Sequence, residues 1–168
     1  MLNKQNIILI GMPGAGKSSV GVILAKVLGY EFIDTDLVIQ HREKRLLREI
    51  IADEGNEGFL AIENEVNATL EADKSVIAPG GSAIYGKEAM EHFKEIGTIV
   101  YLKLSYEDLA KRLGNLKGRG VVLKEGQTLK DLYDERSKLY EQYAEITVDE
   151  SGRDIQGTIL ALRERIGM

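Results

Sequence analysis

Residues 6–21 read NIILIGMPGAGKSSVG, and this stretch decides the fold. An apolar run leads into a glycine-rich loop, and the loop leads into the helical pattern VILAKVLG. The loop matches G-x-x-x-x-G-K-[ST] at Gly11, Gly16, Lys17 and Ser18. Glycines let the backbone curl so that successive N–H groups point inward, and the following helix adds partial positive charge at its N-terminus. In this strand-to-helix context the pattern predicts a phosphate-binding loop rather than an ordinary glycine-rich turn.

The loop also predicts which ligands are bound. Lys17 is expected to hold the β- and γ-phosphates of a nucleotide, and the Ser18 hydroxyl is expected to be a ligand of Mg²⁺. The sequence therefore predicts ATP and Mg²⁺ as cofactors and Lys17 as a catalytic residue. The residues expected around the nucleotide are Gly11, Gly14, Ala15, Gly16, Lys17, Ser18 and Ser19.

Short β-branched runs alternate with segments of helical length along the chain. The runs are 6–10, 31–34, 75–79, 98–104 and 145–149. The helical segments are 17–28, 56–70, 86–96, 106–113, 128–144 and 154–166. Near-continuous apolar strands separated by helices predict a parallel sheet covered on both faces, which is an α/β fold with three layers in α/β/α order. The 168 residues suit a single domain.

Composition narrows the partners and the compartment. The net charge of -5 argues against nucleic acid and anionic membranes as partners. The chain has no cysteine, which excludes disulfides and thiolate metal sites. No apolar run approaches the ~20 residues of a membrane span. We therefore expect a cytoplasmic monomer that acts on a small molecule.

Two carboxylates follow the second apolar run. Asp34 and Asp36 flank Thr35 at the carboxyl end of a predicted strand, the edge where open α/β sheets bind ligands. If the segment stays extended, the two side chains share a face and converge beside the phosphates. One carboxylate could then serve the metal and the other a substrate hydroxyl. The alternative is that Asp36 is the N-cap of a helix that starts at LVIQ.

A second glycine cluster, PGGSA, follows the third run at the same sheet edge. Gly80 and Gly81 would let a substrate approach the backbone closely. An ordinary turn is the alternative explanation for this fragment.

A basic, glycine-containing stretch, KRLGNLKGRG, follows the fourth run. It contains Lys111, Arg112, Lys117 and Arg119. Such a segment could act as a lid, at about 114–126, that brings a cation onto the transferring phosphoryl group. A solvated basic loop is the alternative.

Arg136 lies in a helical segment that has no acid three or four residues away. The flanking positions are Leu132, Tyr133, Leu139 and Tyr140, so an ion pair within the helix is excluded. Its anionic partner must be either an acid from another segment or the carboxylate of a ligand.

Taken together, these motifs resemble the shikimate kinases. GMPGAGKSSVG, FIDTD, APGGSA, LGNLKGRG and ERSKLYEQYAEITVD occur in the family's order and spacing, and the resemblance spans residues 6 to about 150. It implies a five-stranded parallel sheet of the nucleoside monophosphate kinase class, with a mobile lid and a helical substrate-binding region at about 37–72. It also implies transfer of the γ-phosphoryl group of ATP to a ring hydroxyl of shikimate, a step of aromatic amino-acid biosynthesis.

The resemblance assigns roles around the acceptor. It implies that Asp36 binds the substrate diol and orients or deprotonates its hydroxyl, as a catalytic residue. Gly80 and Gly81 would line the substrate pocket, and Arg136 would pair with the substrate carboxylate.

The resemblance assigns further roles on the nucleotide side. Asp34 would hold Mg²⁺ through water, and Arg112 would pack on the adenine. Arg119 would reach the phosphates from the lid as a third catalytic residue.

One departure from the family pattern affects the acceptor. Where the family usually reads G-E-x-x-F-R-x-x-E, this chain has GNEGFLAIE at 55–63, so Leu60 stands in place of an expected carboxylate-binding arginine and Asn56 in place of an acid. Ser82, Gly120 and Lys138 also replace usual family residues. A hydrogen bond to a charged group contributes ~1.5 to 3 kcal/mol, so we expect weak shikimate binding or a related substrate with an apolar group there.

Two other functions stay open on sequence grounds. A different small-molecule kinase, for a sugar acid or a nucleoside monophosphate, would share the phosphate loop. The basic segment HREKRLLR at 41–48 supplies several cations for such an acceptor, and a solvated helix face is the alternative explanation of this segment. A nucleotide-binding module without turnover would also share the loop.

Overall fold

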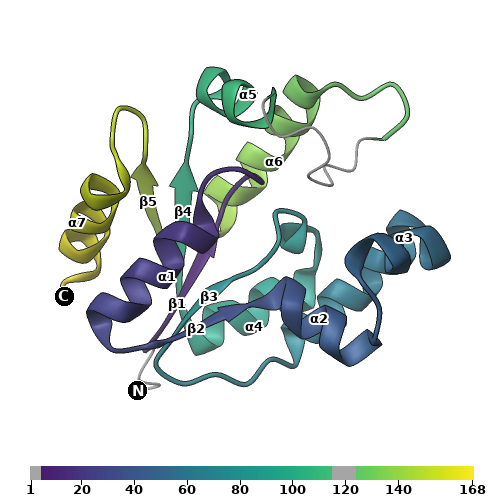
Figure 1. The fold of residues 1–168 in the computed structure, drawn as a ribbon, viewed down its shortest axis with the longest axis horizontal. Coiled ribbons are helices and arrows are strands. Elements are labelled where there is room, and N and C mark those ends of the chain that lie inside the picture. Colours follow the sequence, from purple (N-terminus) through teal and green to yellow (C-terminus); the bar gives the residue numbers. More distant parts are fainter. Residues whose placement is uncertain (1–4, 115–123) are drawn as a thin grey trace.

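The computed structural model describes residues 5–114 and 124–168, which form a parallel sheet of five strands in the order β2-β3-β1-β4-β5 (Figure 1). Ile8 at the centre of β1 is in register with Ile77 of β3 and Ile99 of β4. This confirms the predicted α/β class and the five-stranded parallel sheet. The strands are β1 Asn6–Ile10, β2 Glu31–Asp34, β3 Ser75–Ala78, β4 Gly97–Lys103 and β5 Ile146–Asp149.

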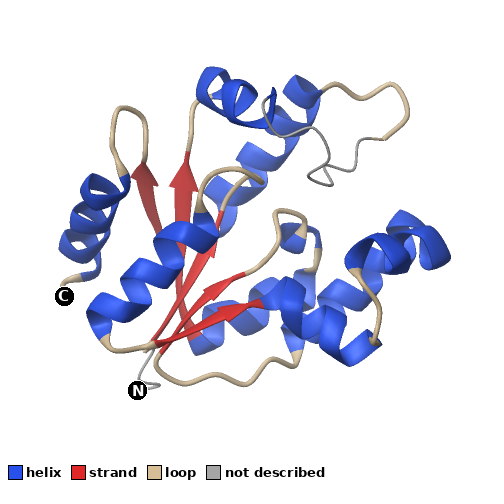
Figure 2. Ribbon diagram, viewed as in Figure 1, coloured by secondary structure: helices blue, strands red, loops and turns tan. Residues whose placement is uncertain are grey.

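Helices cover both faces of the sheet, which gives the three expected layers (Figure 2). α1 and α7 pack together on one face, while α4 and α6 pack against β4 on the other. Within the described residues no helix is both long and apolar enough to cross a membrane. The helices are α1 Lys17–Leu28, α2 Thr35–Glu43, α3 Leu47–Ala68, α4 Lys87–Ile96, α5 Tyr106–Gly114, α6 Leu129–Tyr143 and α7 Ile155–Ile166, with a 3₁₀ turn η1 at Ala83–Tyr85.

The alternation of side chains along β1 divides the core in two. Ile7 and Leu9 face α1 and α7, while Ile8 and Ile10 face α4 and α6. All four are almost completely buried. A strand buried on both faces carries a nearly continuous apolar run, which is why NIILI can be predicted as a strand from the sequence alone.

α2 and α3 form a smaller helical unit beyond the β2 end of the sheet (Figure 1). It has its own buried cluster, formed by Ile39, Ile50, Phe59 and Val66. α3 bends at Gly55, whose φ of 73° and ψ of 177° are open essentially only to glycine. The predicted helix at 56–70 is therefore only the second half of α3.

Candidate active site

The phosphate loop lies between β1 and α1, at the carboxyl edge of the sheet. Gly16 is the N-cap of α1 with φ 81°, a left-handed conformation that glycine adopts without strain. Lys17 is 9% exposed, and its Nζ donates hydrogen bonds to the carbonyl oxygens of Gly11 at 2.7 Å and Met12 at 2.9 Å. Burial lowers the pKa of Lys17 to about 8, although the nearby carboxylate of Asp36 raises it. The ammonium group is thus held inside the loop.

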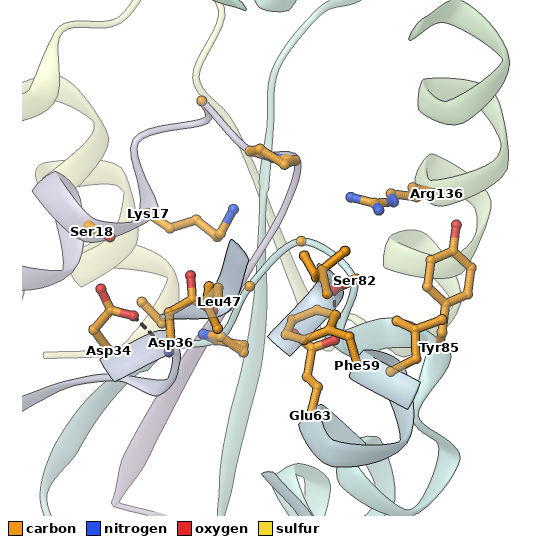
Figure 3. A pocket seen from close by; sticks show the side chains of 18 of the residues that line it. Lys17, Ser18, Asp34, Asp36, Leu47, Phe59, Glu63, Ser82, Tyr85 and Arg136 are labelled. Atoms are coloured by element: carbon orange, nitrogen blue, oxygen red, sulfur yellow. Dashed lines mark hydrogen bonds between the residues drawn. The ribbon is translucent and has the colours of Figure 1, made fainter. Parts of the chain in front are cut away.

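Loop residues border one cavity of about 800 Å³. Gly14, Gly16, Lys17, Ser18 and Ser19 line it, while Gly11 and Ala15 are buried. The same cavity brings together most of the other predicted site residues, namely Asp34, Asp36, Gly80, Gly81 and Arg136. Figure 3 shows Asp34, Asp36 and Arg136 among the side chains that line it.

The two carboxylates reach this cavity in a different way from the one predicted. The chain does not stay extended, because α2 begins at Thr35 directly after β2. Asp34 is the N-cap of α2, and its Oδ1 accepts a hydrogen bond from the Asp36 backbone N–H at 3.0 Å. The alternative that Asp36 is the N-cap of this helix is therefore wrong, because Asp34 is the N-cap and Asp36 lies in the first turn. Burial raises the pKa of Asp36 to about 6, helped by the charge of Asp34 and opposed by that of Lys17.

Glycine is needed at positions 80 and 81 because neighbouring side chains lie close to the backbone there, and not because the backbone has an unusual φ angle. A Cβ on Gly80 would lie 3.1 Å from both Asp36 Oδ1 and Glu63 Oε2. A Cβ on Gly81 would lie 2.8 Å from Pro13 Cδ and 2.9 Å from an Arg136 nitrogen. The glycine pair therefore lets acidic and basic groups from three segments meet at this wall of the cavity.

Arg136 is 5% exposed, and it forms no ion pair with any residue in the described ranges. Its guanidinium carbon lies 5.5 Å from the centre of the Tyr85 ring. Its Nε has no hydrogen-bond partner in the structure. Of the two partners considered from sequence, an acid of another segment does not pair with it in this part of the chain, which favours a ligand.

Glu63 is a site residue that sequence reasoning did not single out as functional. It is 2% exposed, and its Oε1 accepts a hydrogen bond of 2.6 Å from the Ser82 hydroxyl. Its Oε2 has no hydrogen-bond partner among the described residues. Burial raises the pKa of Glu63 to about 7, against the lowering effect of the Ser82 hydrogen bond. The sequence feature that could have identified Glu63 is the acid at the end of GNEGFLAIE, which lies one helical turn after Leu60.

α3 supplies part of the wall of the cavity. Before the bend, Leu47, Arg48 and Ile51 line the cavity, and after it Asn56, Phe59, Leu60 and Glu63 do so. Positions 56, 59, 60 and 63 follow helical spacing, so they lie on one face. Leu60 is thus on the cavity wall, at the position where the resemblance implies a carboxylate-binding arginine.

On the nucleotide side, Arg112 lies next to the phosphate loop, where its guanidinium donates a hydrogen bond of 3.0 Å to the Gly14 carbonyl. Glu150, which the sequence did not indicate, is 5% exposed near Gly16, and burial raises its pKa to about 7. Arg119 and most of the predicted lid lie outside the described residues.

Comparison with known proteins gives a consistent result. The family model described as shikimate kinase matches residues 13–166. A curated relative, shikimate kinase 2 of Yersinia enterocolitica, is 34% identical over 154 residues, which cover 86% of each chain.

Solved structures agree with the sequence comparisons. A shikimate kinase of Acinetobacter baumannii in complex with shikimate superposes with a TM-score of 0.79 at 34% identity, covering 98% of this chain and 92% of the other. A shikimate kinase of Bacteroides thetaiotaomicron gives a TM-score of 0.80 at 27% identity, covering 97% and 98%. Thymidylate kinase of Candida albicans, at 17% identity and a TM-score of 0.61, shares the fold.

Proposed function

This chain belongs to the shikimate kinase family, and on that premise we propose that it transfers the γ-phosphoryl group of ATP to a hydroxyl of shikimate, giving shikimate 3-phosphate. The observation that carries the proposal is the single cavity that joins Lys17 of the phosphate loop to Asp36, the glycine pair and Arg136. A nucleotide at the loop and an acceptor at the far wall would then face each other across this cavity.

On the nucleotide side, the backbone amides of the loop and Lys17 would hold the phosphates. The residues present fit Mg²⁺, because the Ser18 hydroxyl and the Asp34 carboxylate are oxygen donors that line the same cavity. Among the described residues, no group of three or more His, Cys, Asp or Glu side chains is placed to hold a metal ion by itself. Mg²⁺ usually keeps several waters and takes substrate phosphate oxygens as ligands. Bound Mg²⁺ would neutralise charge on the transferring group. Arg112 and Arg119 remain predicted contacts of the nucleotide.

On the acceptor side, Asp36 would orient the attacking hydroxyl and accept its proton. The glycine pair would let the acceptor lie against the backbone, and Arg136 would bind its carboxylate. Positioning and charge neutralisation would supply most of the acceleration, since phosphoryl transfer asks little covalent chemistry of the protein.

The direct test is shikimate-dependent ADP formation in a coupled assay. Lys17→Ala and Asp36→Asn should each abolish turnover, and Asp36→Asn should leave ATP affinity largely intact. Near-normal turnover by Asp36→Asn would show that the assignment to the acceptor is wrong.

A second candidate is a kinase of this fold whose acceptor carries an apolar group, because Leu60 lines the cavity where a cation was expected. A panel of shikimate, quinate, gluconate and nucleoside monophosphates would separate the two. We further propose that the chain acts as a cytoplasmic monomer. The sequence contains no cysteine, which is compatible with a reducing compartment.

A further inference from the structure

The basic segment HREKRLLR contains three arginines, and two of them have structural partners. Arg42 pairs with Glu65, with a nitrogen–oxygen distance of 2.8 Å. Arg45 pairs with Asp53 at 3.1 Å. Arg48 forms no ion pair or hydrogen bond with the described part of the chain, and it lines the cavity. The segment therefore presents one unpaired cation to the acceptor side.

The position of Arg48 is not explained by the stability of its helix. It is the second residue of α3, and a cation in the first turn of a helix is electrostatically disfavoured. Glu49 supports this end of the helix, because its carboxylate accepts a hydrogen bond of 2.8 Å from the Leu46 backbone N–H. Leu47 and Ile51, its companions on the cavity wall, are partly buried in the α2–α3 cluster, whereas Arg48 is exposed. Its guanidinium is therefore available to a ligand.

Two guanidinium groups among the described lining residues are available to bind an anionic group of the acceptor. Among the described lining residues the cations are Lys17, Arg48, Lys124 and Arg136. Lys17 is held by the phosphate loop, and Lys124 lies 3.8 Å from Glu135. Arg136 approaches from α6, and Arg48 approaches from α3.

We propose that Arg48 is a specificity-determining residue that binds the carboxylate of the acceptor from the α3 side of the cavity. It would supply the second cationic contact that Leu60 cannot make. This inference rests on the proposed function, since it names the carboxylate of shikimate as the partner. A guanidinium group suits the task because its N–H fork matches the geometry of a carboxylate.

Steady-state kinetics on the full chain tests the proposal. Arg48→Gln should raise the KM for shikimate about tenfold, with kcat at saturation and the KM for ATP changed by less than about twofold, because one charge-assisted hydrogen bond is lost. Arg45→Gln is the matched control: it removes the same charge from the same segment outside the cavity, and it should leave the KM unchanged. The methyl ester of shikimate, which lacks the negative charge, should react equally with the wild type and Arg48→Gln.

The outcomes separate this inference from the function on which it rests. If the wild type phosphorylates shikimate and Arg48→Gln matches its KM, the inference fails and the proposed function stands. An equal rise in KM for shikimate and its methyl ester also overturns it, because the effect would then not involve the carboxylate. If the wild type shows no shikimate-dependent turnover, both fail.

Discussion

At position 60, a leucine lies on the part of the cavity wall formed by α3, one helical turn before the acid Glu63. Leu60→Arg should place a guanidinium in the cavity and lower the KM for shikimate about tenfold, since a charged hydrogen bond contributes ~1.5 to 3 kcal/mol and ~1.4 kcal/mol corresponds to a factor of ten. Ala61→Arg adds the same charge at the next residue, which is exposed outside the cavity lining, and it should have no such effect. Equal KM values for wild type and Leu60→Arg would contradict this.

Glu63 should make the stability of the protein depend on pH. Its pKa is raised from 4.5 to about 7, so the folded state binds this proton more tightly than the unfolded state. Its contribution to the free energy of unfolding therefore falls as pH rises from about 4.5 to about 7. The charged groups that act on its pKa are Asp36 from α2 and Arg136 from α6, while Ser82 binds it directly.

Glu63→Gln removes this titration and keeps a hydrogen-bond acceptor for Ser82. Relative to the wild type, the variant should gain about 2 kcal/mol in free energy of unfolding between pH 5 and pH 8. Urea denaturation of both proteins at the two pH values measures the difference between their free energies of unfolding. Other titrating groups contribute equally to both proteins, so their effects cancel in this difference. Parallel pH profiles would mean that Glu63 is ionised in the folded protein at pH 5.

At the start of α2, Asp34 has two roles, because it is the N-cap of the helix and a proposed ligand of Mg²⁺. Asp34→Asn should keep the cap, since asparagine caps helices as well as aspartate does, but it should lose turnover because the carboxylate is gone. Asp34→Ala should lose both turnover and about 1 kcal/mol of stability. Denaturation curves and shikimate-dependent ADP formation separate the two effects.

The control for this prediction is the N-cap of α7. Asp154 accepts a hydrogen bond of 2.7 Å from the Gly157 backbone N–H, and it does not line the cavity. Asp154→Ala should therefore lose a similar amount of stability and keep full turnover. Retained activity in Asp34→Asn would show that Asp34 is a cap alone.

Across the whole molecule, the sheet and the phosphate loop were predictable because their signals are local. Buried strands carry unbroken apolar runs, and the predicted bounds 6–10 and 31–34 match β1 and β2. The bounds of α2 and of the first half of α3 were not predicted, because a helix starting at LVIQ was only an alternative and the resemblance implied a helical region at about 37–72 without its separate elements. Gly55 interrupts the helical period of α3, and the apolar residues of this region pack in a small separate cluster. Contacts such as Glu63 with Ser82 join segments 19 residues apart, so only the fold reveals them.

One cavity is lined by both the phosphate loop and α3, and this arrangement predicts how the whole molecule binds its two ligands. The phosphate loop and α3 contribute different residues to its lining, so a change in α3 should leave nucleotide binding at the loop intact. ATP with Mg²⁺ should therefore stabilise the wild type and Leu60→Arg equally, by about 2.7 kcal/mol at 100 times Kd, and should not stabilise Lys17→Ala. Shikimate alone should raise the Tm of Leu60→Arg more than that of the wild type. A thermal-shift series with each ligand measures both effects. A loss of ATP stabilisation in Leu60→Arg would show that the two ends of the cavity do not bind independently.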